Sequence, residues 1–318
     1  METWPRDGVP NSPEAWLLTA ARRRMVDEHR HRRVQEEAST TLTLIVDDEE
    51  SCSSVPDKRL ELLFVCSHPA IDPRMRTPLM LQTVLGLDAA RIGAAFLVPA
   101  GTMSQRLVRI KAKIREAGIT FELPEAAELP SHLEAVLEAI YACYGIGWES
   151  VSGIDANARD LVEEAMWLAR LVIELLPDEP EAKGLLALML HCEARRPARR
   201  DRNGRFVPLS HQDTGLWSGR MINEAERLLI GAAKARRMGR FQLEAAIQSA
   251  HAERARSGCV DWSAVEQLYA GLAILAPSIG AELGRAAAVA ELNSAGAALA
   301  LVDSIAPARV VSYQPYWF

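Results

Sequence analysis

The sequence has few of the features that mark a disulfide-bonded, metal-binding or membrane-spanning protein. Its five cysteines are far apart in 318 residues and form no Cys-x-x-Cys pair, so it predicts neither a disulfide framework nor a zinc ribbon. An odd number of cysteines without a secretory signal is typical of a reducing cytosol, and we expect a cytoplasmic protein. No run of about 18 apolar residues occurs, so we expect no transmembrane helix and no membrane partner.

The sequence also lacks the short motifs of common enzyme classes. It contains no Gly-x-Ser-x-Gly elbow, no Walker loop and no Rossmann fingerprint. Cys66 and His68 form one pair of metal-ligating side chains without a second pair nearby, so we interpret them as part of a helix end rather than as a zinc site. We therefore expect no enzyme, no catalytic residue, no metal ligand and no cofactor.

The composition is that of a folded, helix-rich protein. Apolar residues make up 49% and charged residues 25% of the chain, which excludes disorder as the main state. Aromatic residues are only 6%, whereas Ala and Leu are abundant, so we predict an all-α fold with two or three domains. The formal charge of −6 excludes a uniformly basic nucleic-acid coat, but basic residues gather in particular segments.

The first two segments are a basic helix and a polar linker. Residues 14–37 show helical spacing of apolar residues, and residues 22–33 hold six Arg and two His against two acids. This basic face either contacts a DNA backbone or is simply solvated. Residues 38–57 are rich in Thr, Ser, Asp and Glu, which favours a mobile tether over a strand at 42–46.

Residues 58–120 are predicted to form a compact helical domain that contains a helix-turn-helix. We expect helices at 59–67, 74–85, 88–96 and 100–117, with Asp88 as an N-cap. The third and fourth are joined by a tight turn, and the spacing of their apolar residues is that of a helix-turn-helix. The residues predicted to point inward are Ile92, Phe96, Val98, Met103, Leu107 and Ile110.

The helix from Ala100 carries polar and basic residues suited to DNA. Gln and Arg side chains can make bidentate contacts to base edges in the major groove, and Lys and Arg neutralise phosphates. The alternative is a helical hairpin with a solvated basic face. The residues predicted to face outward are Thr102, Ser104, Gln105, Arg106 and Arg109, followed by the basic Lys111, Lys113 and Arg115.

Residues 121–318 are predicted to form a TPR-like array of helical hairpins. Residues 175–187 and 275–287 share one pattern: a helix end, a Pro-containing turn, and a helix with a Gly where a neighbour packs closely. Residues 195–209, with six Arg against one Asp, interrupt the array, and Asn203-Gly204 predicts a hairpin turn there. A further set of residues is interpreted as core rather than as the lining of a partner groove: Asp213, Trp217, Met221, Trp262 and Tyr269.

Four separated motifs, in the same order, resemble the extracytoplasmic-function sigma factors of bacteria, in the subgroup with a TPR-like C-terminal extension. Residues 4–24 resemble the end of the sigma-2 domain, residues 57–70 the opening of the sigma-4 domain, and residues 96–118 the helix that reads the −35 element. Three further segments resemble the extension: residues 175–190, 194–199 and 313–317. The first sigma-2 helices and the last hairpin are missing from this match, so we expect a chain shortened at both ends.

The resemblance implies a sigma factor that directs RNA polymerase to promoters and is itself no enzyme. Its domains would be a sigma-2 remnant at 1–37, a linker at 38–57, a sigma-4 domain at 58–120 and an extension at 121–318. Its partners would be promoter DNA, core RNA polymerase and a regulatory protein at the array. The alternative is a TPR-like interaction scaffold with a weak or vestigial helix-turn-helix. The DNA-binding residues would be Arg23, Arg24 and Arg30 at the −10 element, with Gln105 and Arg106 reading −35 bases beside Thr102, Ser104, Arg109, Lys111 and Lys113.

Overall fold

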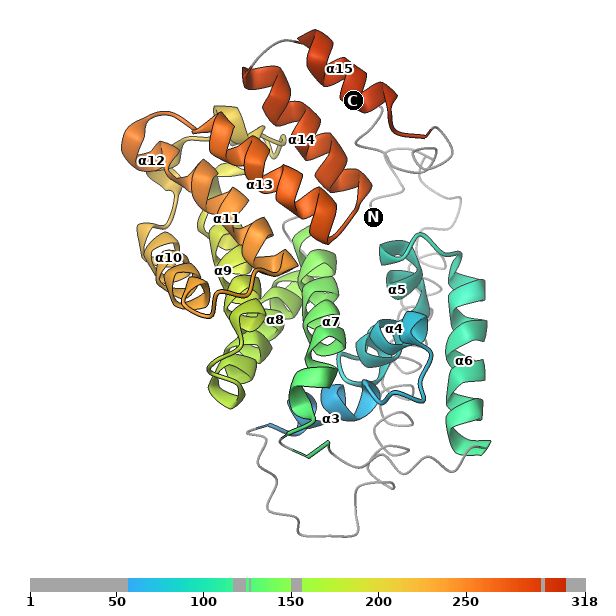
Figure 1. Cartoon of the computed structure of the whole chain (residues 1–318). Coiled ribbons are helices and arrows are strands. Elements are labelled where there is room, and N and C mark those ends of the chain that lie inside the picture. The colour runs from blue at the N-terminus through green and yellow to red at the C-terminus, as the bar shows by residue number, and fades with distance from the viewer. Residues whose placement is uncertain (1–56, 117–123, 126, 150–155, 293–294, 307–318) are drawn as a thin grey trace, which may run out of the picture. The chain divides into compact units, whose positions relative to one another are not determined.

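The computed structural model describes residues 57–116, 124–125, 127–149, 156–292 and 295–306 (Figure 1). Within these residues the chain is helical, and the one β-bridge joins Arg200 to Phe206. The prediction of an all-α fold is confirmed for this part of the chain. The predicted sigma-2 remnant with Arg23, Arg24 and Arg30 lies outside the described residues, as does the linker before Asp57.

The chain divides into two compact units after Ala158, and each is described by itself. The first unit holds α3 to α7, and the first four of these helices agree with the predicted ones to within two residues at each end. Among its described residues no helix is long and apolar enough to cross a membrane, and the same holds for the second unit. The helices of the first unit are α3 (Lys58–Cys66), α4 (Pro73–Thr83), α5 (Ala89–Ala95), α6 (Ala100–Glu116) and α7 (Leu129–Glu149).

Three aspartates start helices of the first unit. The side chains of Asp57, Asp72 and Asp88 each accept a hydrogen bond from a backbone N–H in the first turn of α3, α4 and α5, at 2.7, 3.0 and 2.8 Å. Each carboxylate satisfies an N–H that the helix leaves unpaired and lies at the positive end of the helix dipole. The prediction of Asp88 as an N-cap is therefore confirmed.

Helix α7 packs against α3, α4 and α5 of the first unit rather than standing apart from them. Its residues Val136, Ala139 and Ile140 are completely buried. Nδ1 of His132 at its start lies 2.6 Å from the buried hydroxyl of Ser67 at the end of α3. The sequence placed α7 in the extension that begins at 121, whereas its buried apolar face makes it part of the first unit.

The second unit is a succession of antiparallel helices. Helix α9 packs against both α10 and α11, α13 against α14, and α14 against α15. The Arg170 guanidinium of α8 bonds to Glu224 of α10. The helices are α8 (Ala156–Leu175), α9 (Pro180–Ala194), α10 (Gly219–Ala233), α11 (Arg240–Ala252), α12 (Arg254–Ser257), α13 (Trp262–Leu275), α14 (Ile279–Leu292) and α15 (Ala295–Asp303).

The two Pro-containing segments of the pseudo-repeat have the predicted structure. Helices α8 and α13 end at Leu175 and Leu275, and the next helices begin at Pro180 and Ile279. A Cβ at Gly184 would lie 2.6 Å from the backbone N of Gln242, and one at Gly284 would overlap the Tyr269 ring. Both glycines are therefore points of close helix approach, as the sequence predicted.

The predicted aromatic stripe is core only in part. Trp217 is buried, and Tyr269 packs against the buried cluster that Leu243 and Leu272 help to form. Met221 and Trp262 are half-buried. Asp213 is exposed and caps the short helix Thr214–Leu216, so it is not a core residue, because its carboxylate accepts from the N–H of Gly215 at 2.8 Å.

Candidate nucleic-acid interface

The helix-turn-helix is formed by α5 and α6, which pack against each other in the first unit (Figure 1). Met103, Leu107 and Ile110 of α6 are buried, and Ile92 of α5 is completely buried. Spacing of three and four residues puts the α6 side chains on one face of the helix, so the opposite face is left to solvent. These inward positions are confirmed.

The opposite face of α6 is polar, basic and open. Thr102, Ser104 and Gln105 are exposed, and their side chains make no hydrogen bond to other described residues. Arg106 and Arg109 are also exposed, and neither has a carboxylate partner in the described part of the chain. The predicted outward direction of these five side chains is confirmed, so the face can contact a large anionic partner.

The basic residues at the end of α6 differ in exposure. Lys113 is exposed, whereas Lys111 is half-buried and burial lowers the pKa of its ammonium. Lys111 lies near Cys66, whose thiol has its pKa raised to about 11 by burial despite a contact of 3.7 Å to Thr83. Lys111 is therefore less open to a phosphate than Lys113.

A Schellman motif closes α5 and sets the angle between the two helices. The N–H of Val98 donates to the carbonyl of Gly93 at 2.8 Å, and the N–H of Leu97 donates to that of Ala94 at 3.2 Å. A Cβ at Gly93 would lie 2.6 Å from the Val98 carbonyl oxygen, so the turn packs against α5 without space for a side chain there. The N–H of Met103 then donates to the Pro99 carbonyl, which starts α6.

In this turn the structure differs from the prediction at Phe96 and shows an unusual backbone conformation at Leu97 that the sequence did not indicate. Phe96 was predicted to point inward but is 38% exposed, because the chain reverses direction directly after it, and Val98 is only half-buried. Leu97 is 70% exposed and has φ of 53°, in the left-handed region where glycine is the usual residue. The Leu-Val-Pro sequence before Ala100 contains no residue type that signals this conformation.

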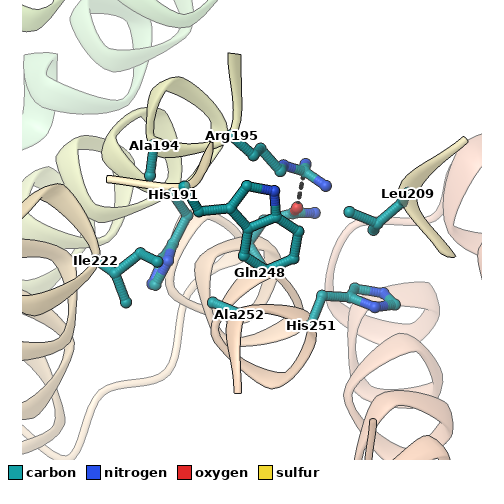
Figure 2. A pocket seen from close by; sticks show the side chains of 9 residues that line it. His191, Ala194, Arg195, Leu209, Ile222, Gln248, His251 and Ala252 are labelled. Carbon is teal, nitrogen blue, oxygen red and sulfur yellow. Dashed lines mark hydrogen bonds between the residues drawn. The ribbon is translucent and has the colours of Figure 1, made fainter. Parts of the chain in front are cut away.

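A small pocket in the second unit was not predicted (Figure 2). It lies between the end of α9, the loop before α10, and α11, and it has room for about one water molecule. Figure 2 shows Arg195 bonded to Gln248, with His191 and His251 at opposite sides of the pocket. Burial, reinforced by the charge of Arg195, lowers the pKa of both His191 and His251 to about 4. Both imidazoles are therefore neutral at pH 7.

The pocket is a structural feature rather than a substrate site. Its space is far below the several hundred Å³ of a small-molecule site. The ring nitrogens of His191 and the indole N–H of Trp217 are buried without a hydrogen bond to the described residues. Across the described residues no three His, Cys, Asp or Glu side chains gather where they could hold a metal ion. His68, in the Cys66–His68 pair, accepts from the N–H of Ala70 and so stabilises the helix end.

Comparison with known proteins gives one match to a protein family and one related protein. Residues 132–233, from α7 to α10, match a protein family described as a family of unknown function (DUF6596). The chain is 38% identical over 314 residues to an uncharacterized protein, R00370, of Rhizobium meliloti (strain 1021), and the match covers 96% of this chain and 74% of that protein. No solved structure matches the chain.

Proposed function

This chain belongs to one family with the Rhizobium meliloti protein, and we propose that it acts as a sigma factor that directs RNA polymerase to promoters. The observation that carries the proposal is the helix-turn-helix of α5 and α6, whose open face holds polar and basic side chains without a hydrogen-bond or ion-pair partner among the described residues. The order of the sigma-2, sigma-4 and extension motifs in the sequence supports the same function.

In this proposal α6 lies in the major groove of the −35 element. Gln105 and Arg106 donate to base edges, because amide and guanidinium groups match adenine and guanine there. Thr102 and Ser104 lie in the first turn, where the helix N-terminus approaches the duplex. Arg109 and Lys113 hold phosphates, and Lys111 has a smaller share because it is half-buried.

The remaining parts of the chain would serve the same role. Core RNA polymerase would carry out all the chemistry, so the chain itself would be no enzyme and would work in the cytoplasm without a cofactor. The arginines Arg23, Arg24 and Arg30 would contact the −10 element. The TPR-like extension would receive a regulatory protein.

A second candidate function is that of a TPR-like interaction scaffold. The repeated helix–Pro turn–helix segments around Gly184 and Gly284 favour it, since stacked helical hairpins commonly bind other proteins. The two functions differ in their response to salt. Binding of duplex DNA by α6 would weaken with a log–log slope of about −0.9 per phosphate contact, whereas a scaffold with a vestigial helix-turn-helix would bind weakly at every salt concentration.

The direct test is selection of a bound sequence from random duplexes, followed by substitution of α6. We expect Arg106→Ala and Arg109→Ala each to weaken binding of the selected duplex by about 1–3 kcal/mol. Arg106→Ala should also relax the preference at one base pair, whereas Arg109→Ala should lower the salt slope by about 1. Arg220→Ala removes an exposed arginine from α10 and is the control for loss of charge.

If neither substitution in α6 weakens binding beyond the Arg220→Ala control, α6 is not the recognition helix. Co-elution of the full chain with core RNA polymerase in size-exclusion chromatography tests the second part of the proposal. A folded chain that binds the selected duplex but never co-elutes with the polymerase is a DNA-binding protein of another kind.

A further inference from the structure

The basic segment that interrupts the array forms a tight turn closed by a single β-bridge. Arg200 and Phe206 pair as an antiparallel bridge, and the N–H of Val207 donates to the carbonyl of Arg199 at 2.8 Å. Gly204 at the tip has φ of 77°, a conformation that glycine adopts without strain. The hairpin turn that the sequence predicted at Asn203-Gly204 is therefore confirmed. We refer to residues 199–207 as the arginine hairpin.

Hydrogen bonds inside the arginine hairpin hold its shape. One carboxylate oxygen of Asp201 accepts from the N–H groups of Asn203 and Arg205, both at 2.8 Å. The Arg200 guanidinium donates to the Gly204 carbonyl at 2.7 Å, across the turn. The single acidic side chain of the hairpin is thus used by its own backbone, and these bonds stabilise the turn.

The base of the hairpin is fastened to the helical array. The side-chain amide of Gln212 donates to the Val207 carbonyl at 3.1 Å. Arg254 of α12 donates to the carbonyls of Ser210 and Gln212 at 2.6 and 2.7 Å, and its guanidinium lies 5.2 Å from the centre of the Trp217 ring. This anchoring keeps the tip in a fixed place on the second unit.

The tip presents positive charge beside an exposed aromatic ring. Arg202 and Arg205 are exposed, and their guanidinium groups have no hydrogen bond or ion pair within the described residues. Arg196, by comparison, is neutralised by Glu193 at 2.6 Å. Phe206 is 62% exposed next to these charges. The hairpin therefore presents two guanidinium groups and one aromatic ring to solvent. Such a surface suits a polymer that carries both negative charges and planar groups.

We propose that the arginine hairpin binds single-stranded nucleic acid. Arg202 and Arg205 contact phosphates, and Phe206 stacks on an unpaired base, because proteins that bind single strands combine a basic surface with aromatic side chains. An acidic peptide would satisfy the two arginines but leave the ring without a flat partner. The hairpin belongs to the second unit and α6 to the first, and the proposal uses no residue of α6, so it does not depend on the proposed promoter reading.

The test is the affinity of the full chain for a fluorescein-labelled oligothymidylate, measured by anisotropy at several salt concentrations. We expect Phe206→Ala to weaken binding about tenfold, as for other stacking residues. Phe206→Leu keeps the apolar volume and should weaken binding as much, because it has no ring. The double change of Arg202 and Arg205 to Ala should lower the salt slope by about 0.7 for each lost phosphate contact.

Matched controls are Leu216→Ala, for loss of an exposed apolar side chain, and Arg220→Ala, for loss of an exposed charge. All variants are repeated in a chain that also carries Arg106→Ala and Arg109→Ala, which are expected to weaken duplex binding by α6. If the hairpin substitutions weaken oligothymidylate binding in both backgrounds, the proposal is supported, whether or not α6 reads promoters.

Two results would overturn it. One is oligothymidylate binding that is unchanged by all the hairpin substitutions. The other is that polyglutamate displaces the oligonucleotide while Phe206→Ala has no effect on binding. That result would indicate that the hairpin binds acidic proteins.

Discussion

Single residues decide the angle between α5 and α6, and Leu97 does so at a cost in backbone energy. Its φ of 53° places its Cβ close to backbone atoms, which costs a non-glycine residue about 1–2 kcal/mol. Its side chain is 70% exposed and recovers little of that energy by burial. Leu97 therefore keeps a strained conformation directly before the helix that we propose to read DNA.

We predict that Leu97→Gly is more stable than Leu97→Ala by about 1 kcal/mol. Both changes remove the exposed side chain, but only glycine also relieves the left-handed backbone strain. Chemical unfolding of the two variants measures the difference directly. An alanine variant as stable as the glycine variant would show that the turn relaxes to another conformation in solution.

At the scale of elements, helix pairs in the second unit are held by close approach and by caps supplied from a neighbour. Glu181 of α9 accepts from the N–H groups of Phe241 and Gln242 at 2.9 and 3.0 Å, so it caps the start of α11 from another helix. The same end of α9 brings Gly184 against the backbone of α11. These contacts orient α9 and α11 relative to each other.

We predict that Gly184→Ala destabilises the second unit by about 1–3 kcal/mol, the range for overpacking, because the added methyl group meets backbone atoms that cannot move aside. Gly231→Ala in α10 is the matched control. Its nearest neighbour would be 3.8 Å away, so the better helix propensity of Ala should make it neutral or stabilising. Equal thermal unfolding of the two variants would refute the close contact.

At the scale of the whole molecule, buried neutral histidines make stability depend on pH. His191 and His251 have folded-state pKa values of about 4, against about 6.5 in an unfolded chain. The unfolded state therefore binds more protons between these values, so their contribution is complete above pH 6.5 and is lost as the pH falls toward 4. The Glu226 carboxylate lies 3.4 Å from Nε2 of His191 and accepts from the Ser249 hydroxyl, but burial and the Arg195 charge still lower the pKa of His191.

We predict that the free energy of unfolding falls between pH 7 and pH 5 by an amount on the order of 1–3 kcal/mol for His191 alone. His191→Gln should make this dependence shallower because it removes one titrating group. Chemical unfolding of both proteins at each pH gives their difference in unfolding free energy. The effect of carboxylate protonation is the same in both proteins and drops out of this difference. Parallel curves for the two proteins would mean that His191 is accessible to protons in the folded state.

The helix boundaries and turns were largely predictable because they depend on residues close in sequence. Asp88 caps α5, Gly204 turns the hairpin, and the segments before Pro180 and Ile279 end their helices as expected. The apolar spacing of Met103, Leu107 and Ile110 was enough to define which face of α6 is buried. The all-α class follows from the same local preferences.

The sequence by itself thus determined the helices, their caps and the open face of α6, since each rests on contacts within one or two turns. Only the tertiary structure decided the exposure of Phe96, the partial burial of Lys111 and the packing of α7 on α3, α4 and α5. It alone showed that Arg202 and Arg205 are exposed on an anchored hairpin and have no ion pair among the described residues. These features depend on contacts between residues that are far apart in the sequence. The spacing of apolar or charged residues along one segment does not reveal which other segment packs against it.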